Sequence, residues 1–69
     1  MQLSARNQLN ATVETVNHGE VMSTVKVTLP DGQKITSAIT KEAATEVGVA
    51  PGDQVLVVIK PTEVMLAKE

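Results

Sequence analysis

The sequence predicts a small, mainly β domain, and two features of the chain support this prediction. Short stretches rich in Val, Ile, Leu and Thr are separated by turn signals, Pro-Asp-Gly at residues 30–32 and Pro-Gly-Asp at residues 51–53. A single short segment rich in Ala and Glu, residues 41–47, has a helical pattern instead. Three strands, a helix and two further strands follow one another. This is the element order of a five-stranded OB-like barrel with one short helix between strands 3 and 4.

The first three strands are expected to form two consecutive hairpins. Residues 9–14 alternate between apolar and polar side chains, which is typical of a half-buried strand. Residues 17–20 and 30–32 are predicted to be the two turns. The second and third strands each carry one apolar face, formed by Val21, Val25, Val27 and Leu29 in the second strand and by Ile35 and Ile39 in the third.

The predicted helix covers residues 41–47. Thr40 precedes it, and a threonine hydroxyl at this position can accept a hydrogen bond from the first turn. Gly48 follows it, and glycine adopts the left-handed conformation that ends many helices. The first N–H groups of such a helix also suit a bound anion, so Thr40 has two possible roles.

Residues 55–60 form the densest aliphatic run of the chain, Val-Leu-Val-Val-Ile-Lys. Both alternating sets of side chains are apolar up to Ile59, which predicts a strand buried on both faces. Lys60 then places an ammonium at the end of this strand, where it needs either a partner or access to water. Pro61 ends regular pairing because it has no N–H to donate, and residues 63–68 are expected to form the fifth strand.

Length and composition limit the classes of function. The 69 residues are expected to form a single domain, residues 1–69, and a chain this short without cysteine often associates with copies of itself. The chain has no Phe, Tyr or Trp and only 6 Lys and Arg against 8 Asp and Glu, which argues against a nucleic-acid partner. No apolar run reaches the length of a membrane span and no signal peptide is visible, which is compatible with a cytoplasmic protein that has no membrane partner.

Catalysis and direct metal binding are also disfavoured. His18 is the one histidine of the chain, there is no cysteine, and the carboxylates are scattered along the sequence. One imidazole cannot form a protein zinc site without several converging carboxylates, so no residue is expected to be a direct metal ligand. We expect His18 to be a solvated turn residue rather than a general base, and the protein to be neither an enzyme nor dependent on a cofactor.

An anion site remains, because polar residues lie at several element boundaries. Ser4 and Arg6 precede the first strand, Thr40 begins the helix and Lys60 ends the fourth strand. Hydroxyl, N–H and ammonium groups are hydrogen-bond donors that suit an oxyanion. Each residue also has a purely structural interpretation, since Arg6 and Lys60 can be solvated charges and Thr40 can be only a helix cap.

Several short motifs span nearly the whole chain, from about residue 3 to residue 68. They are Ser4-Ala5-Arg6-Asn7-Gln8-Leu9, Ile39-Thr40, Gly52-Asp53, Val58-Ile59-Lys60 and Thr62-Glu63-Val64-Met65. At these separations the motifs resemble those of the Mop or molbindin family, small cytoplasmic molybdate- and tungstate-binding proteins of the TOBE type. The resemblance implies binding of these oxyanions for intracellular molybdenum storage or homeostasis. The alternative is a non-binding oligomerisation module related to the TOBE domains of transporters and regulators.

The resemblance also implies an assembly and a set of site residues. It implies OB-like barrels completed by strand exchange in a dimer, with three dimers forming a hexamer and the oxyanion pocket lying between subunits. Matched to the family's motif, Ser4 and Thr40 supply hydroxyl groups and Lys60 supplies the charge. Ala5 and Arg6 supply backbone N–H groups.

Two further expectations come from the resemblance. Family members commonly have Ala or Ser after the lysine, whereas Pro61 stands here and cannot donate an N–H to an anion. Family hexamers also have a second class of anion site on the symmetry axis, and residues 17–22 are the candidate for it.

The expected donor set favours fully deprotonated dianions. Molybdate and tungstate at neutral pH only accept hydrogen bonds, whereas phosphate is partly protonated and needs an acceptor beside it. A pocket of hydroxyl, N–H and ammonium groups without a carboxylate should therefore disfavour phosphate. Sulfate has the same charge and protonation as molybdate, so only the size of the cavity can exclude it.

Overall fold

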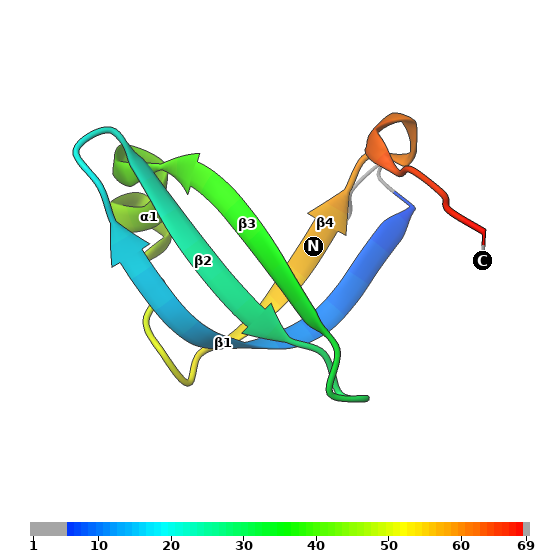
Figure 1. Ribbon diagram of the computed structural model, residues 1–69. Coiled ribbons are helices and arrows are strands. Elements are labelled where there is room, and N and C mark those ends of the chain that lie inside the picture. Colours follow the sequence, from blue (N-terminus) through cyan, green and yellow to red (C-terminus); the bar gives the residue numbers. More distant parts are fainter. Residues whose placement is uncertain (1–5, 69) are drawn as a thin grey trace.

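The computed structural model describes residues 6–68, which form one curled antiparallel sheet and a short helix. The elements are β1 (Asn7–His18), β2 (Met22–Thr28), β3 (Lys34–Thr40), α1 (Lys41–Val47), β4 (Gln54–Ile59) and the short 3₁₀ helix η1 (Pro61–Glu63). The strand order in the sheet is β3-β2-β1-β4, so β3 and β4 are its two edges. In Figure 1 the sheet forms an open V. The left arm carries α1, the right arm carries β4 and η1, and β1 runs through both.

β1 takes part in both arms because it changes its pairing partner along its length. Its first half pairs with β4 and its second half with β2. Between Val13 and Thr15 the register shifts, which leaves Glu14 as an extra residue in a β-bulge, and a bulge bends its strand. The Val13 N–H donates to the Asp53 carbonyl and the Gly52 N–H donates to the Val13 carbonyl, both at 2.8 Å. These bonds tie the bend of β1 to the loop before β4.

The buried core is small and consists of Ala11, Val13, Val25, Val27 and Ala44. Val25 and Val27 confirm the apolar face predicted for the second strand. The prediction for Val21 is wrong, because Val21 lies in the turn before β2 and is 71% exposed. Ser23 takes the first inward position of β2 instead, and its side chain is fully buried.

The first hairpin turn covers residues 19–21 rather than the predicted 17–20. The Gly19 N–H donates to the Met22 carbonyl at 2.8 Å, and a Cβ at Gly19 would lie only 2.9 Å from the same oxygen. β1 therefore continues to His18, whose Nδ1 lies 2.7 Å from the Ser23 Oγ. His18 is exposed, as predicted, but it belongs to a strand and gives the buried Ser23 hydroxyl its hydrogen-bond partner.

The helix and both of its caps confirm the prediction. α1 spans Lys41–Val47, and the Thr40 Oγ1 accepts a hydrogen bond from the Ala43 N–H at 3.0 Å. Gly48 ends the helix with a φ of 72°, and its N–H donates to the Ala44 carbonyl at 3.0 Å.

β4 is less buried than predicted. Among the described strands it pairs only with β1, so its other edge is open. Alternate side chains are half-buried, whereas Leu56 and Val58 are 39% and 44% exposed. The prediction of a strand buried on both faces is therefore wrong for the single chain, because residues 6–68 cover Leu56 and Val58 only in part.

The predicted fifth strand, residues 63–68, does not form in the described chain. Pro61–Glu63 form the short helix η1, in which the Glu63 N–H donates to the Lys60 carbonyl at 2.9 Å. An extended segment becomes a strand only when another strand pairs with it, and residues 64–68 have no such partner within residues 6–68. Residues 6–68 of the single chain therefore form a four-stranded half-barrel rather than a closed five-stranded barrel.

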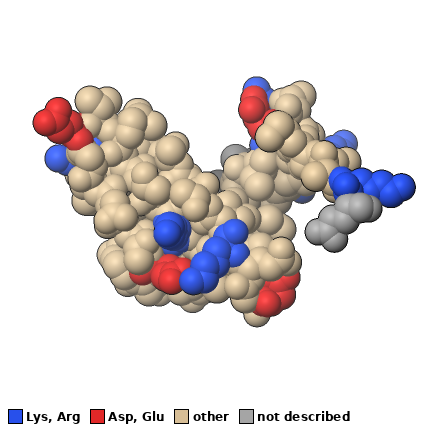
Figure 2. Space-filling view, in the orientation of Figure 1, with Lys and Arg blue, Asp and Glu red and all other residues tan. Residues whose placement is uncertain are grey.

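A hollow of about 200 Å³ lies between the arms. Aliphatic residues from all four strands line it, together with Val47 and Val49, and Ser37 is the one polar residue of its described lining. Figure 2 shows an uncharged surface between the arms and charged atoms toward the ends of the arms and along the lower edge. Within residues 6–68, no helix has the length and hydropathy needed to cross a membrane.

Candidate functional site

Two of the predicted site residues, Arg6 and Lys60, lie together at the end of the right arm. Arg6 immediately precedes β1 and Lys60 immediately follows β4 (Figure 1). The residues next to them, Asn7 and Ile59, are paired in the β1–β4 ladder, so both cations lie at the same end of that ladder. Both side chains are exposed, and within residues 6–68 neither forms an ion pair. Two neighbouring cations without a carboxylate partner attract an anion.

Thr40, the third described site residue, belongs to the other arm. Its Oγ1 accepts a hydrogen bond from the Ala43 N–H, which leaves the hydroxyl proton of Thr40 available to donate. Thr40 ends β3, and the strand order places β3 and β4 at opposite edges of the sheet. The hydroxyl donor and the two cations of the predicted site are therefore on different arms of the chain.

Three carboxylates share a hollow with Thr40 in the single chain. A shallow hollow of about 780 Å³ beside it is lined by residues that include Glu20, Glu42 and Glu46. They lie near one another because a backbone hydrogen bond from the Lys41 N–H joins the start of α1 to the turn before β2. The prediction of a pocket without carboxylates concerns a site between subunits, which residues 6–68 of one chain do not contain, so it stays a prediction. An anion at this position needs cations from elsewhere to offset the negative charge.

The described chain carries two separate halves of the predicted site. The right arm supplies Arg6 and Lys60, and the left arm supplies the hydroxyl of Thr40. Ser4 and Ala5 lie outside the described residues, so their roles stay predictions. A tetrahedral oxyanion accepts hydrogen bonds on all sides, and neither half alone surrounds it with donors.

The candidate for a second anion site, residues 17–22, uses part of its hydrogen-bonding capacity internally. His18 Nδ1 forms a hydrogen bond with the Ser23 hydroxyl, and the Gly19 N–H donates to the Met22 carbonyl. Glu20 adds a negative charge to the same segment. The role of this segment in anion binding therefore stays a prediction.

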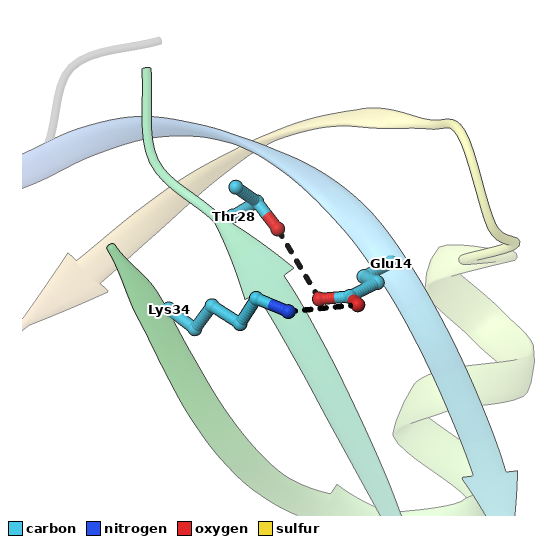
Figure 3. A network of polar contacts seen from close by, with 3 residues as sticks. All are labelled: Glu14, Thr28 and Lys34. Atoms are coloured by element: carbon cyan, nitrogen blue, oxygen red, sulfur yellow. Dashed lines mark hydrogen bonds and ion pairs between the residues drawn. The ribbon is translucent and has the colours of Figure 1, made fainter. Parts of the chain in front are cut away.

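A polar network on the outer side of the bulge was not predicted from the sequence. Figure 3 shows Glu14 with Lys34 and Thr28, three residues from three strands. The Lys34 ammonium lies 3.0 Å from one carboxylate oxygen of Glu14, and the Thr28 hydroxyl donates to the other oxygen at 3.3 Å. These contacts, the Lys34 hydrogen bond above all, hold the pKa of Glu14 below its ordinary value. The carboxylate is thus already paired, and no group of three or more His, Asp or Glu side chains in the described chain is placed to hold a metal.

Comparison with protein families finds one match over most of the chain. Residues 3–66 match the TOBE domain. The chain is 46% identical over 67 residues to the molybdenum-pterin-binding protein MopA of Rhodobacter capsulatus, covering 97% of this chain but spanning only 25% of MopA. It is 39% identical over 66 residues to the molybdenum-pterin-binding protein 3 of Clostridium pasteurianum, covering 96% of this chain and 97% of that protein.

Solved structures with the same fold carry related names. MopII from Clostridium pasteurianum, solved in an apo form, superposes with a TM-score of 0.92 at 37% identity, covering 97% of this chain and all of that chain. The cytoplasmic molybdate-binding protein ModG, solved with molybdate bound, gives a TM-score of 0.82 at 47% identity. That superposition covers 87% of this chain and 43% of ModG.

Proposed function

Because this chain belongs to the TOBE domain family, and within it to the molybdenum-pterin-binding proteins, we propose that it binds molybdate and tungstate for molybdenum storage and homeostasis in the cytoplasm. One observation of its own structure supports the proposal most. Arg6 and Lys60 lie together at the end of the β1–β4 ladder, exposed and without an ion pair in residues 6–68. The proposal describes binding and release of an ion, not catalysis.

The chemistry of these groups suits a dianion that carries no proton. The ammonium of Lys60, the hydroxyl of Thr40 and the backbone N–H of Arg6 all donate hydrogen bonds. Molybdate and tungstate accept on every oxygen, whereas phosphate also needs an acceptor for its proton at neutral pH. Selection against phosphate therefore requires that the carboxylates near Thr40 stay out of hydrogen-bond reach of the bound ion.

A pterin, which the names of the relatives also include, is less well supported as the ligand. A planar heterocycle is usually bound against an aromatic ring, and this chain has no Phe, Tyr or Trp. The hollow at Thr40 offers no aromatic surface either, since its described lining is Glu20, Val21, Thr40, Lys41, Glu42, Thr45 and Glu46. We therefore propose the oxyanion itself as the ligand.

We further propose that the site is completed between subunits of a strand-exchanged dimer, and that three dimers form a hexamer. Three features of the single chain support this. The two halves of the site lie on different arms, the hollow between the arms is lined mainly by aliphatic side chains, and β3 and β4 each have an edge that no strand of residues 6–68 pairs with. An exposed tail with Val64, Met65 and Leu66 can supply the missing strand to a partner, which closes both barrels.

Titration calorimetry tests the proposal directly. The protein should release or absorb heat when molybdate or tungstate is added, with a saturating isotherm, and phosphate at the same concentration should give little heat. The alternative, an oligomerisation module that binds no ligand, predicts no heat with any of the three ions. A phosphate isotherm as strong as that of molybdate would show that the pocket contains an acceptor.

A further inference from the structure

The end of the left arm carries a net negative charge. Glu20, Glu42 and Glu46 line the same shallow hollow as Lys41, so three carboxylates stand against one ammonium and the formal charge is −2. Figure 2 shows acidic atoms at the tip of this arm. We call these four residues, with the neighbouring Val21, the acidic patch.

The right arm carries the opposite charge. Arg6, Lys60 and Lys68 stand against Glu63 in the described residues of this arm, and Glu69 follows Lys68 in the sequence, so the formal charge of these five residues is +1. In Figure 1 the tail after η1 continues from the right arm, and Figure 2 shows Lys and Arg atoms on this arm. We call these residues, with the tail residues 64–67, the basic patch.

Both patches also expose large apolar side chains. Val21 in the acidic patch is 71% exposed, and Val47, which ends α1 and lines the hollow between the arms, is 70% exposed. Met65 and Leu66 in the basic patch are 92% and 93% exposed. Single exposed aliphatic residues are common, but here they are grouped at two ends of one small chain, each group beside charges of one sign.

We propose that the basic patch of one copy docks on the acidic patch of a second copy, and that this charge complementarity steers and aligns the self-association. This inference rests on the proposed assembly and specifies which surfaces meet in it. In a two-fold dimer each copy offers both patches, so the same contact forms twice. All four patches of the dimer are then covered, and none is left to bind a further copy. Opposite potentials accelerate encounter and fix the alignment of partners more than they raise affinity.

The same contact would complete the oxyanion site. It brings the arm that carries Thr40 in one copy to the arm that carries Arg6 and Lys60 in the other. Without such a contact, the acidic patch repels a dianion and the basic patch lacks the hydroxyl donor. In this contact the carboxylates of the acidic patch and the oxyanion both face the cations of the basic patch. The oxyanion must therefore bind beside the ion pairs between the two patches, without replacing them.

Sedimentation velocity of charge variants tests this inference. One double variant, Glu42→Lys/Glu46→Lys, makes the acidic patch basic. The other double variant, Lys60→Glu/Lys68→Glu, makes the basic patch acidic. Each variant alone should self-associate at least roughly tenfold more weakly than the parent at low salt, because like charges then meet. A mixture of the two variants should assemble, because every contact in the mixed dimer is again between opposite charges.

Salt and a control variant complete the experiment. Raising NaCl from about 10 mM to about 1 M shortens the Debye length from about 30 Å to about 3 Å, and should reduce the difference between parent and variants. The control Glu14→Gln/Asp31→Asn removes two carboxylates away from both patches while keeping hydrogen-bond acceptors, and should assemble like the parent. Variants that assemble like the parent at every salt concentration would overturn the inference while leaving self-association intact. A parent chain that stays monomeric at every salt concentration would instead overturn the proposed assembly.

Discussion

The corner of the sheet where β1 meets β2 and the arm formed by β4 differ sharply in how far they are buried. Val25 and Val27 in the corner are 4% and 3% exposed, whereas Leu56 and Val58 in β4 are 39% and 44% exposed. Both regions have similarly aliphatic sequences, so composition does not explain the difference. The corner is covered by parts of its own chain, whereas residues 6–68 leave an aliphatic face of the β4 arm partly open. This is the pattern expected when one region folds alone and the other is completed by a partner.

The largest effect is expected from a substitution in the corner. Val13→Ala removes two buried methyl groups and leaves a cavity at a position that is 2% exposed. The free energy of unfolding should therefore fall by about 2–3 kcal/mol. Chemical denaturation should show this loss at every protein concentration, because the contacts are within one chain. A loss that appears only at high protein concentration would mean that the corner is also completed by a partner.

A matched substitution in the β4 arm should behave differently. Val58→Thr replaces a methyl group by a hydroxyl of similar size, which is tolerated at an exposed position but costs about 1–2 kcal/mol when it is buried without a partner. The Tm should therefore fall at protein concentrations where the oligomer forms and stay unchanged in the dilute chain. Equal Tm values for variant and parent in the oligomer would show that the partner does not cover this face.

A smaller effect is expected beside the proposed site. Pro61 is the first residue of η1, where a backbone N–H has no hydrogen-bond partner within the helix. Proline has no N–H, so Pro61→Ala adds a free donor next to Lys60. One further hydrogen bond to the anion, worth about 0.5–1.5 kcal/mol, should tighten molybdate binding roughly two- to tenfold. Calorimetry of both proteins measures the change, and weaker binding by the alanine variant would mean that Pro61 itself shapes the pocket.

The smallest effect concerns the pH dependence that Glu14 contributes. Because Lys34 lowers the pKa of Glu14 in the folded chain, the carboxylate binds protons less readily there than in the unfolded chain. Its stabilising contribution is present above the ordinary carboxyl pKa of about 4.3 and is lost as the pH falls below it through the folded value. The Glu14→Gln variant should therefore lose less stability than the parent between neutral and acidic pH, by a small margin because the pair is exposed. Parallel pH profiles would show that the ion pair contributes nothing.

The parts of the fold that depend on neighbours in the sequence were predictable. Thr40 and Gly48 mark the ends of α1 because capping is decided within a few residues, and the Pro-Asp-Gly turn marks the β2–β3 hairpin for the same reason. The bulge at Glu14 and the burial of Ser23 were not predictable, because each depends on how distant strands align. The missing fifth strand has the same cause, since a strand needs a pairing partner that local sequence cannot specify.

The candidate site was predictable only in part. The residue types and their positions at element ends indicated an anion site, and the structure brings Arg6 and Lys60 together through the pairing of β1 with β4. The separation of Thr40 from these cations follows from the strand order and the bend of β1, which no local pattern gives. Of the carboxylates near Thr40, Glu42 and Glu46 belong to the helix that Thr40 begins, whereas Glu20 is distant in the sequence and joins them only where the turn before β2 lies beside α1.

The central claim, that one oxyanion site combines residues of two chains, is tested most directly by mixing two deficient variants. Lys60→Met keeps the aliphatic stem but removes a charge-assisted hydrogen bond of about 1.5–3 kcal/mol, so molybdate affinity should fall roughly 10- to 100-fold. Thr40→Asp keeps a helix cap for the Ala43 N–H but places a carboxylate where the dianion would bind.

Each variant alone should bind molybdate weakly in calorimetry. When the two are unfolded together and refolded, each mixed pair should contain one site with both Lys60 and Thr40 intact, because the sites of a two-fold dimer take these residues from opposite chains. The account predicts that a fraction of sites with parent-like affinity reappears in the mixture. Affinity in the mixture that equals the average of the two variants, with no parent-like sites, would contradict it.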